Sequence, residues 1–500
     1  MKVLLISTNK IRVPRPALPI GMAYISAALK QAGHEVRVLD LLWEAREIQA
    51  VRKCLAEEQF DVVGIAVRNL DNLTYVDPIF FAPLIEKIVM CVKKYSSAKV
   101  VIGGTGFSVE PMAFFEYARP DFGVCGAGES SIVMLIDRLQ KEGDLSTVPG
   151  LCYVDCDGNY VQNHPEFSFN ERTLVPDRSV YDRRYFRTEV SAISDLTRES
   201  QPAIETLQTK RGCNLTCSYC IIRKTEGKKI RYRAPEEVVS EIRRAVVENP
   251  AVKEFELVDA TFNSPPDYAF QICEEMIRKD LDVPWYCQLS PNTVTPELLD
   301  VMAAAGCIRV DLGTDAFTDE ALSNLNKGFD MSKVVQVDQY LTNSPIEHTH
   351  CVFLGGPGET VAALRESLDI SERFLNPSQI YANLGIRILS GTKLYRQAVE
   401  AGILESGQSV FTPAYYVEPE IRKEAKILEL VRERYLNHKN WYLWWGLRGQ
   451  SLSERANLSD QAVLEMRREY GRTMSGKPRL VRAYRTKSNL QILGQSRGLT

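Results

Sequence analysis

Histidine is scarce in this chain, and long apolar runs are missing. Only five of the 500 residues are histidine, and apolar stretches such as Val62–Val67 are far shorter than the roughly 18 residues of a membrane helix. Lysine and arginine total 61 against 64 for aspartate and glutamate, so no basic excess favours nucleic-acid binding. After Met1–Ser7 the chain turns polar, which is too early for a signal peptide. These absences predict a cytoplasmic protein with no membrane span and no nucleic-acid partner.

Twelve cysteines occur in a chain that shows no export signal. In a reducing compartment, clustered cysteines are more often metal ligands than disulfide partners. Nine are scattered, and we expect most of these to behave as small buried apolar residues. The scattered nine are Cys54, Cys91, Cys125, Cys152, Cys156, Cys273, Cys287, Cys307 and Cys351. The other three lie within a stretch of eight residues.

Residues 1–145 alternate between short apolar segments and segments with helical periodicity. A helix is predicted at Gly21–Gln31, where Ile25, Ala28 and Leu29 share one face. The predicted strands are Val3–Ser7, Glu35–Leu39, Asp61–Val67, Lys99–Gly103 and Phe122–Val124. This alternation is typical of an α/β fold with a doubly wound parallel sheet, which binds ligands at the carboxyl ends of its strands.

Three further regions follow. Residues 146–195 are predicted to be a hairpin, Leu151–Val161, and a linker. A second alternation in residues 196–412 predicts a partly closed parallel βα barrel. Its strands are Ile204–Gln208, Glu254–Val258, Trp285–Gln288, Ile308–Leu312, Thr349–Leu354 and Tyr381–Ile386. Residues 413–500 are predicted to be a helical C-terminal domain, in which Trp441–Trp445 either packs or faces the substrate.

The strongest chemical signal is the loop that follows the first barrel strand. Cys213, Cys217 and Cys220 are spaced as CxxxCxxC, at the end of the barrel where such folds keep their chemistry. Structural zinc would need a fourth protein ligand, and the next cysteine is Cys273. Three thiolates with an open position suit a 4Fe–4S cluster with one unprotected iron. A zinc site and plain buried thiols remain the alternatives.

This loop resembles the signature of the radical S-adenosylmethionine superfamily, and the whole chain resembles its cobalamin-binding branch, the class B methyltransferases. The resemblance implies a Rossmann-like cobalamin domain, a partial (β/α)6 barrel and a helical C-terminal region. It also implies that Cys213, Cys217 and Cys220 hold the cluster, whose fourth iron binds S-adenosylmethionine. The implied S-adenosylmethionine contacts are Tyr219, Phe262, Asn263, Asp315, Lys327, Gly355, Gly356 and Arg387. Taken singly, the glycines would indicate a turn and Asp315 a helix N-cap.

The same resemblance implies a cobalamin site at the strand ends of the N-terminal domain. The implied contacts are Pro19, Gly21, Arg68, Asn69, Gly103, Gly104, Phe107, Gly126, Gly128 and Glu129. The alternative is a Rossmann-like domain that uses these glycines for ordinary turns. No histidine occurs in Ser7–Gly21, where cobalamin mutases carry the histidine that binds cobalt. Arg68 is therefore expected below the corrin or, alternatively, in a surface salt bridge.

Together these features predict an enzyme that transfers a methyl group from methylcobalamin to a carbon of a small-molecule, lipid or peptide substrate. The resemblance implies three cofactors: a 4Fe–4S cluster, S-adenosylmethionine and cobalamin. It also implies an external electron donor of the flavodoxin or ferredoxin type. The alternative enzyme reaction is cyclisation, ring contraction or C–C coupling with the same cofactors. A non-enzymatic cobalamin or iron–sulfur sensor is disfavoured, since no DNA-binding pattern accompanies the predicted domains.

Overall fold

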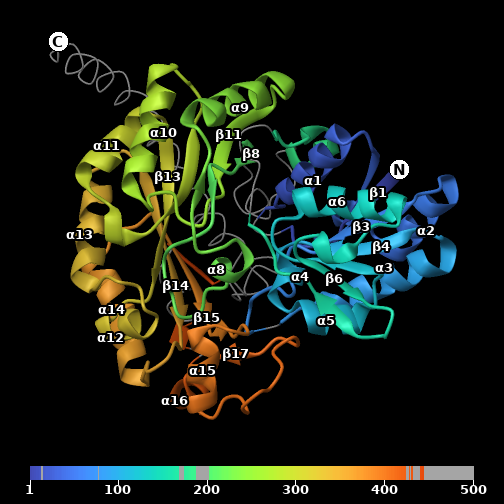
Figure 1. Cartoon of the computed structure of the whole chain (residues 1–500). Coiled ribbons are helices and arrows are strands. Elements are labelled where there is room, and N and C mark those ends of the chain that lie inside the picture. The colour runs from blue at the N-terminus through green and yellow to red at the C-terminus, as the bar shows by residue number, and fades with distance from the viewer. Residues whose placement is uncertain are drawn as a thin grey trace.

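The computed structural model describes residues 1–12, 15–76, 78–167, 174–186, 202–423, 427, 430–431 and 440–443. Two seven-stranded sheets, each with its own helices, make up this part of the chain (Figure 1). No helix among the described residues is long and apolar enough to cross a membrane. The α/β class predicted from the alternation of strands and helices is confirmed.

The N-terminal sheet has the strand order β2-β1-β3-β4-β5-β6-β7. Its parallel strands are β1 (Lys2–Ser7), β2 (Glu35–Asp40), β3 (Val62–Ala66), β4 (Lys99–Gly103) and β5 (Phe122–Val124). The predicted hairpin is present as β6 (Leu151–Val154) and β7 (Tyr160–Gln162), and it pairs antiparallel with β5. The hairpin therefore extends the N-terminal sheet rather than standing apart with the linker.

Helices cover both faces of this sheet. The helices are α1 (Ile20–Gln31), α2 (Glu47–Glu57), α3 (Ala82–Tyr95), α4 (Thr105–Val109), α5 (Pro111–Ala118) and α6 (Gly128–Lys141). One core joins the sheet to α2, α3 and α5, and a second core joins its other face to α1 and α6. Strands buried on both faces read as continuous apolar runs, which explains the sequence of β1 and β3. Only the loops at the strand ends remain for binding a ligand.

The second sheet is parallel throughout, in the order β18-β15-β14-β13-β12-β11-β8. Its strands are β8 (Ala203–Leu207), β11 (Val252–Leu257), β12 (Trp285–Leu289), β13 (Cys307–Asp315), β14 (Glu347–Leu354), β15 (Gln379–Leu384) and β18 (Trp441–Leu443). The edge strands β8 and β18 are not paired with each other. The predicted partly closed barrel is thus present, with one strand more than the six predicted.

The additional strand corrects the prediction for the aromatic run Trp441–Trp445. Residues Trp441–Leu443 form β18, parallel to β15, instead of part of a helix. Trp441 is fully buried in the barrel core, so it has the packing role. Trp444 and Trp445 lie outside the described residues. The described part of the C-terminal region also contains β17 (Tyr415–Tyr416) and the short helix α16 (Pro419–Lys423).

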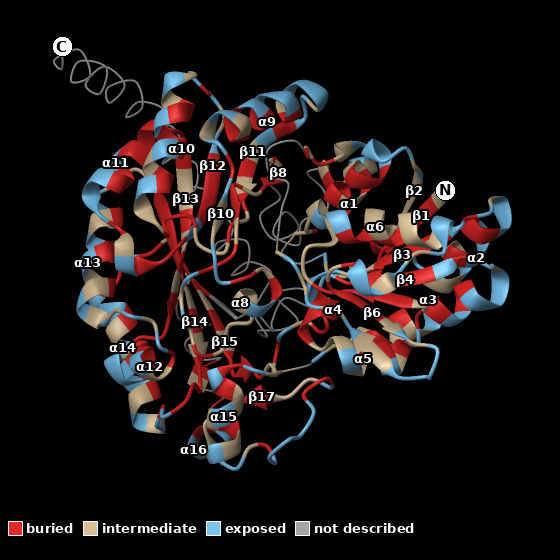
Figure 2. Cartoon of the chain, in the orientation of Figure 1, coloured by how far each residue is buried: buried red, intermediate tan, exposed pale blue. Residues whose placement is uncertain are grey.

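The barrel sheet is covered by helices on one face only. The covering helices are α9 (Pro235–Glu248), α10 (Pro266–Arg278), α11 (Pro296–Ala304), α13 (Met331–Thr342) and α14 (Val361–Phe374), around the outside of the sheet in Figure 1. Phe255, Cys287 and Val310 point into that outer core. Residues alternate along a strand, so Glu256 and Gln288 point to the opposite, inner face. That face carries many partly exposed residues and is turned towards the N-terminal domain (Figure 2).

Buried polar contacts join the two domains at this inner face. Arg387, on β16 (Ile386–Arg387), bonds through Nε to Asp71 Oδ2 at 2.6 Å, with both side chains buried. Arg211, on β9 (Lys210–Arg211), bonds to Glu129 of α6 at 2.7 Å. Asp71 follows β3, and Glu129 follows β5, so the carboxyl ends of the N-terminal strands face the barrel. The two predicted ligand-binding edges are thereby brought together.

Candidate functional site

The cysteine loop is held in place by its backbone. It runs from β9 to the short helix α8 (Ile222–Thr225). Cys213 N–H donates to the Gly227 carbonyl at 3.2 Å, and Ser218 N–H donates to the Leu325 carbonyl at 2.9 Å. The Ser218 carbonyl accepts from Leu394 N–H at 2.8 Å. The loop is therefore fixed both by the nearby Gly227 and by two segments that lie more than 100 residues further along the chain.

Cys213, Cys217 and Cys220 are all free thiols and lie close enough to affect one another. Burial, and to a smaller extent the neighbouring sulfurs of Cys217 and Cys213, raise the pKa of the Cys220 thiol to about 11. Burial also raises the pKa of Cys217, which the Lys327 ammonium opposes from 3.7 Å. A cation beside these sulfurs is suited to a group that must be bound as thiolate.

The spacing of the three sulfurs tests which metal centre they fit. Among the described residues, Asp338, His348 and His350 form a group whose ligand atoms all lie within 4.8 Å of one another, and the three cysteines do not. Sulfurs bound to one zinc ion at about 2.3 Å lie roughly 4 Å apart. In this arrangement the three sulfurs are not all as close together as the ligands of one zinc ion, which favours a cluster over the zinc alternative. Their number and spacing fit an iron–sulfur cluster.

Three of the residues predicted to bind S-adenosylmethionine come together beside Cys217. Tyr219 Oη and Lys327 Nζ both donate hydrogen bonds to Asp315 Oδ2. Asp315 ends β13 with a φ of 68°, in the left-handed region that is uncommon for a residue with a side chain. Such backbone is found at ligand sites, where the surroundings hold it. Asp315 is thus placed as the centre of this group and is not a helix N-cap.

A second anchoring network, missed by the sequence analysis, lies on the other side of the loop. Lys210 Nζ donates to the carbonyl oxygens of Phe262 at 2.8 Å and Ser264 at 2.7 Å. Asp259 accepts from the backbone N–H groups of Thr209 at 2.7 Å and Lys210 at 3.2 Å. Burial lowers the pKa of Lys210 to about 8, which Asp259 opposes. The signal in the sequence was a lysine three residues before the first cysteine of the motif.

The remaining residues predicted for S-adenosylmethionine have mostly structural contacts. Phe262 is fully buried and packs on Trp285, because its ring points into the outer core. Asn263 is also fully buried and bonds to both backbone groups of Ser290. Arg387 uses Nε on Asp71 and its other nitrogens on backbone carbonyls. These three side chains therefore have partners within the chain, and their contact with S-adenosylmethionine stays a prediction.

Gly355 and Gly356 do remain at a strand end, in the loop after β14. Gly355 has a φ of 79°, and its N–H donates to the carboxylate of Glu359. Burial raises the pKa of Glu359 to about 7. The backbone of this loop is thus held by a buried acid whose protonation changes near neutrality.

In the predicted cobalamin site, packing explains some of the glycines and not others. A Cβ at Gly104 would lie 2.6 Å from the Val67 carbonyl oxygen, and Gly128 would crowd Ile25 at 3.1 Å. Gly126 has a φ of 80°. By contrast, Gly21 is exposed, and a Cβ there would meet no atom within 4 Å. Gly103 also has ordinary room for a Cβ. Packing therefore leaves Gly21 and Gly103 without an internal reason to be glycine.

Two other predicted cobalamin residues contact the protein itself. Phe107 is fully buried, and its ring fills the space that a side chain at Gly123 would need. Glu129 binds Arg211 of the barrel. The ring of Phe107 therefore packs in the core of the domain, and its contact with cobalamin stays a prediction. Pro19, which precedes α1, is partly exposed.

Arg68 is exposed and follows β3. Among the described residues it forms no ion pair, and its contact is with the neighbouring Asn69 side chain at 3.3 Å. Burial by the surrounding protein lowers its pKa, although Glu256 opposes this. The surface salt bridge considered as an alternative is therefore not observed. Arg68 and Asn69 follow β3, at the edge that faces the barrel.

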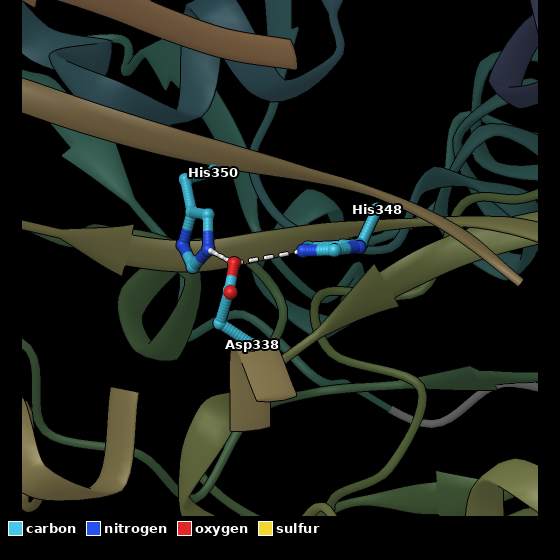
Figure 3. Close-up of side chains that lie close together, drawn as sticks. All are labelled: Asp338, His348 and His350. Carbon is cyan, nitrogen blue, oxygen red and sulfur yellow. Dashed lines mark hydrogen bonds and ion pairs between the residues drawn. The ribbon is translucent and has the colours of Figure 1, made fainter. Parts of the chain in front are cut away.

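The group of possible metal ligands on the outer side of the barrel is a hydrogen-bonded network (Figure 3). Asp338 Oδ1 is 2.8 Å from His348 Nε2 and 3.1 Å from His350 Nε2. Asp338 Oδ2 accepts from Asn376 N–H at 2.9 Å, and His350 Nδ1 lies 2.6 Å from Thr314 Oγ1. All three ligands are buried. The network joins α13 to β13 and β14 and accounts for these atoms without an ion.

Comparison with known proteins identifies both domains. Residues 7–136 match the model of the B12 binding domain, and residues 207–370 match that of the radical SAM superfamily. Tryptophan 2-C-methyltransferase of Streptomyces laurentii is 25% identical over 461 residues, 80% of this chain and 74% of that protein. Cytidylyl-2-hydroxyethylphosphonate methyltransferase of Streptomyces wedmorensis is 24% identical over 460 residues, 81% of this chain and 82% of that protein.

The same architecture is found among solved structures. The radical S-adenosylmethionine methyltransferase TsrM from Kitasatospora setae, with cobalamin and a 4Fe–4S cluster bound, has a TM-score of 0.77 at 21% identity. The similarity covers 94% of this chain and 99% of that one. The predicted combination of an N-terminal cobalamin domain with a radical SAM barrel is confirmed.

Proposed function

The chain belongs to the cobalamin-binding branch of the radical SAM superfamily, and we propose that it transfers a methyl group from cobalamin to a carbon atom of a small molecule. The observation that supports this most directly is the placement of the two sites. The cysteine loop with Tyr219, Asp315 and Lys327 lies at the barrel side of the interface, and Arg68 lies at the opposing strand ends. A substrate held between the domains would be within reach of both cofactors.

When bound, the cluster and S-adenosylmethionine supply a radical, and cobalamin supplies the methyl group. Cys213, Cys217 and Cys220 would hold the cluster. Asp315, positioned by Tyr219 and Lys327, would bind the hydroxyls of the nucleoside, for which a carboxylate is a strong acceptor. The backbone of Gly355 and Gly356 would approach the same ligand closely.

On the N-terminal side, the exposed residues Gly21 and Arg68 and the partly exposed residues Asn69 and Gly103 would hold cobalamin. Since no histidine occurs in Ser7–Gly21, we expect no imidazole below cobalt, and Arg68 would disfavour any other donor there. Electron paramagnetic resonance of the cobalt(II) form tests this point, because an axial imidazole gives nitrogen hyperfine splitting. We expect none. Clear nitrogen coupling would show that the domain binds cobalamin differently.

The proposal also includes an electron donor, a cellular location and alternative substrates. Reduction of the cluster calls for an external one-electron donor of the flavodoxin or ferredoxin type. All twelve cysteines are free, which supports a reducing, cytoplasmic location. Lipid and peptide substrates are the alternatives to a small molecule.

The experiment that tests methyl transfer uses S-adenosylmethionine labelled in its methyl group, with anaerobic protein that carries both cofactors. We expect S-adenosylhomocysteine and 5′-deoxyadenosine in comparable amounts per methylated product. Deoxyadenosine without the homocysteine product would favour cyclisation, ring contraction or C–C coupling. The homocysteine product alone, with a methylated substrate, would indicate polar transfer to a nucleophilic carbon.

A further inference from the structure

The inner face of the barrel sheet carries charged side chains that no feature of the cofactor sites explains. Pairing of the strands places Glu256 of β11, Tyr286 of β12 and Arg309 of β13 in one row across the sheet. Glu254 lies two residues before Glu256 and so shares its face. Strands of a parallel sheet are normally apolar because both faces are covered. Charges here indicate a face that serves a ligand.

Part of this charge is neutralised from the N-terminal domain. Arg15, in the loop after β1, binds the Glu256 carboxylate and the Tyr286 hydroxyl. This contact spans the interface between the domains, and it accounts for Glu256. Glu254 on β11 and Arg309 on β13, which flank β12, take no part in this contact.

Arg309 has a cationic group with no hydrogen bond among the described residues. Its guanidinium lies over the Tyr286 ring, 4.0 Å from the ring centre, and its Nε is 3.9 Å from Asp311 Oδ1. A stacked guanidinium keeps its planar N–H edge available for a carboxylate or phosphate. Glu254 likewise forms no hydrogen bond or ion pair with the described residues, and burial raises its pKa.

Arg309 and Glu254 face a space that solvent reaches, and neither forms a hydrogen bond with the described residues. Arg309 and Asp311 form a loose ion pair at 3.9 Å, with side chains 28% and 24% exposed, and Gln288 of the central strand β12 is exposed. The backbones of β11 and β13 are roughly 10 Å apart, since β12 lies between them. A ligand that offers a hydrogen-bonding group of opposite charge to each of the two side chains would be favoured.

We propose that this face binds a free α-amino acid, with Arg309 pairing with its carboxylate and Glu254 with its ammonium group. A multiply charged anion is disfavoured, because Arg309, Asp311 and Glu254 together carry no net positive charge. An uncharged lipid chain would leave Arg309 and Glu254 without a hydrogen bond, so a ligand with both a negative and a positive group fits best. That the amino acid is the substrate rests on the proposed methyl transfer. Its binding does not, and can be measured without the reaction.

The test is equilibrium dialysis of the cofactor-loaded protein against an equimolar mixture of the twenty L-α-amino acids, followed by mass spectrometry of the protein chamber. We expect one or a few amino acids to be retained. Their N-acetyl and C-terminal amide analogues should be retained at least tenfold more weakly. Retention of both analogues equal to that of the free amino acid, or no retention of any amino acid, would overturn the proposal.

Variants assign the two charges. Arg309→Gln should weaken retention of the free amino acid at least tenfold and affect the amide analogue, which lacks the carboxylate, little. Glu254→Gln should also weaken retention of the free amino acid at least tenfold, and should affect the N-acetyl analogue, which lacks the ammonium group, little. Arg278→Gln, on the exposed side of α10, is the matched control and should change nothing. Iron and cobalamin content must stay unchanged in each variant. Loss of cobalamin from Arg309→Gln would overturn the assignment, because Arg309 would then contact the cofactor.

The labelled S-adenosylmethionine experiment separates this inference from the proposed function. A retained amino acid that acquires the methyl label supports both. A retained amino acid that never acquires it would contradict methyl transfer and leave the binding site in place.

Discussion

The two sheets have the same number of strands, but helices cover both faces of the N-terminal sheet and only one face of the barrel sheet. In the first, the central strands β1 and β3 are buried on both faces, so ligand contacts are expected in loops such as that containing Arg68 and Asn69. In the second, one face of each strand is free for chemistry. Glu254 and Arg309 therefore occupy positions whose counterparts in the first sheet are apolar.

This difference separates residues whose change should damage folding from residues whose change should damage function. Within the N-terminal sheet, strand substitutions should lower stability and loop substitutions should affect binding. In the barrel, binding residues lie in both strands and loops. Four predictions test this contrast, in order of decreasing effect.

The largest effect is expected from the cysteine loop. Replacement of Cys213, Cys217 or Cys220 by alanine should abolish cleavage of S-adenosylmethionine and remove most of the roughly four irons per chain, because each thiolate holds one iron. Circular dichroism should show an unchanged fold. Cys156→Ala, at an exposed position, is the control and should keep its iron. Stoichiometric zinc in the unmodified protein would contradict the assignment.

The second prediction compares one strand residue from each sheet. Ile6 of β1 is fully buried, so Ile6→Ala should lower the free energy of unfolding by about 2–5 kcal/mol. Gln288 of β12 is exposed on the inner face, so Gln288→Ala should change it by less than about 0.5 kcal/mol. Chemical denaturation of both variants measures this. Equal losses would break the contrast between the sheets.

The third prediction concerns the covered face of the barrel sheet. Asp338→Ala leaves the donors of His348, His350 and Asn376 without their acceptor, and should cost about 3 kcal/mol. Gln339→Ala, at an exposed position of the same helix, is the control. A stabilising effect of added zinc on the unmodified protein, lost in Asp338→Ala, would show instead that the group binds an ion.

The smallest effect is a pH dependence at the Gly355 loop. Burial raises the pKa of Glu359 to about 7, so the folded state holds a proton that the unfolded state has released. The stability that this proton contributes is complete below the unfolded pKa of about 4.3, and it decreases as pH rises through about 7. Thermal unfolding of Glu359→Gln should show a weaker pH dependence over that range. If the pH dependence of stability is unchanged in Glu359→Gln, a group other than Glu359 causes it.

Much of the fold was predictable because periodicity is a local property. Strand β4 has the predicted bounds, and β5 does too. Strand β18 was missed, since its assignment depends on pairing with β15, more than fifty residues earlier, and not on the local aromatic pattern.

The site was predictable where a motif fixes the spacing, and less so where partners are distant. Cys213, Cys217 and Cys220 follow from spacing, and Tyr219, Asp315 and Lys327 do come together. Arg387 could not be assigned from sequence, because its partner Asp71 is 316 residues away. The burial of Phe107 and Phe262 could not be read from sequence, because a strand-end aromatic can point into the core or into the site. Glu254 and Arg309 were overlooked, although a charge within an apolar strand is the available signal.

The late position of β18 has a consequence for how the chain is made. Synthesis proceeds from the N-terminus, so β15 is complete 56 residues before Trp441 is added. At about 5–20 residues per second, the hydrogen-bonding edge of β15 stays open for roughly 3–11 s. An open, apolar edge is a template for pairing with another chain. The nascent protein therefore passes through an interval in which aggregation competes with completion of the barrel, and slow translation of residues 385–440 would lengthen it.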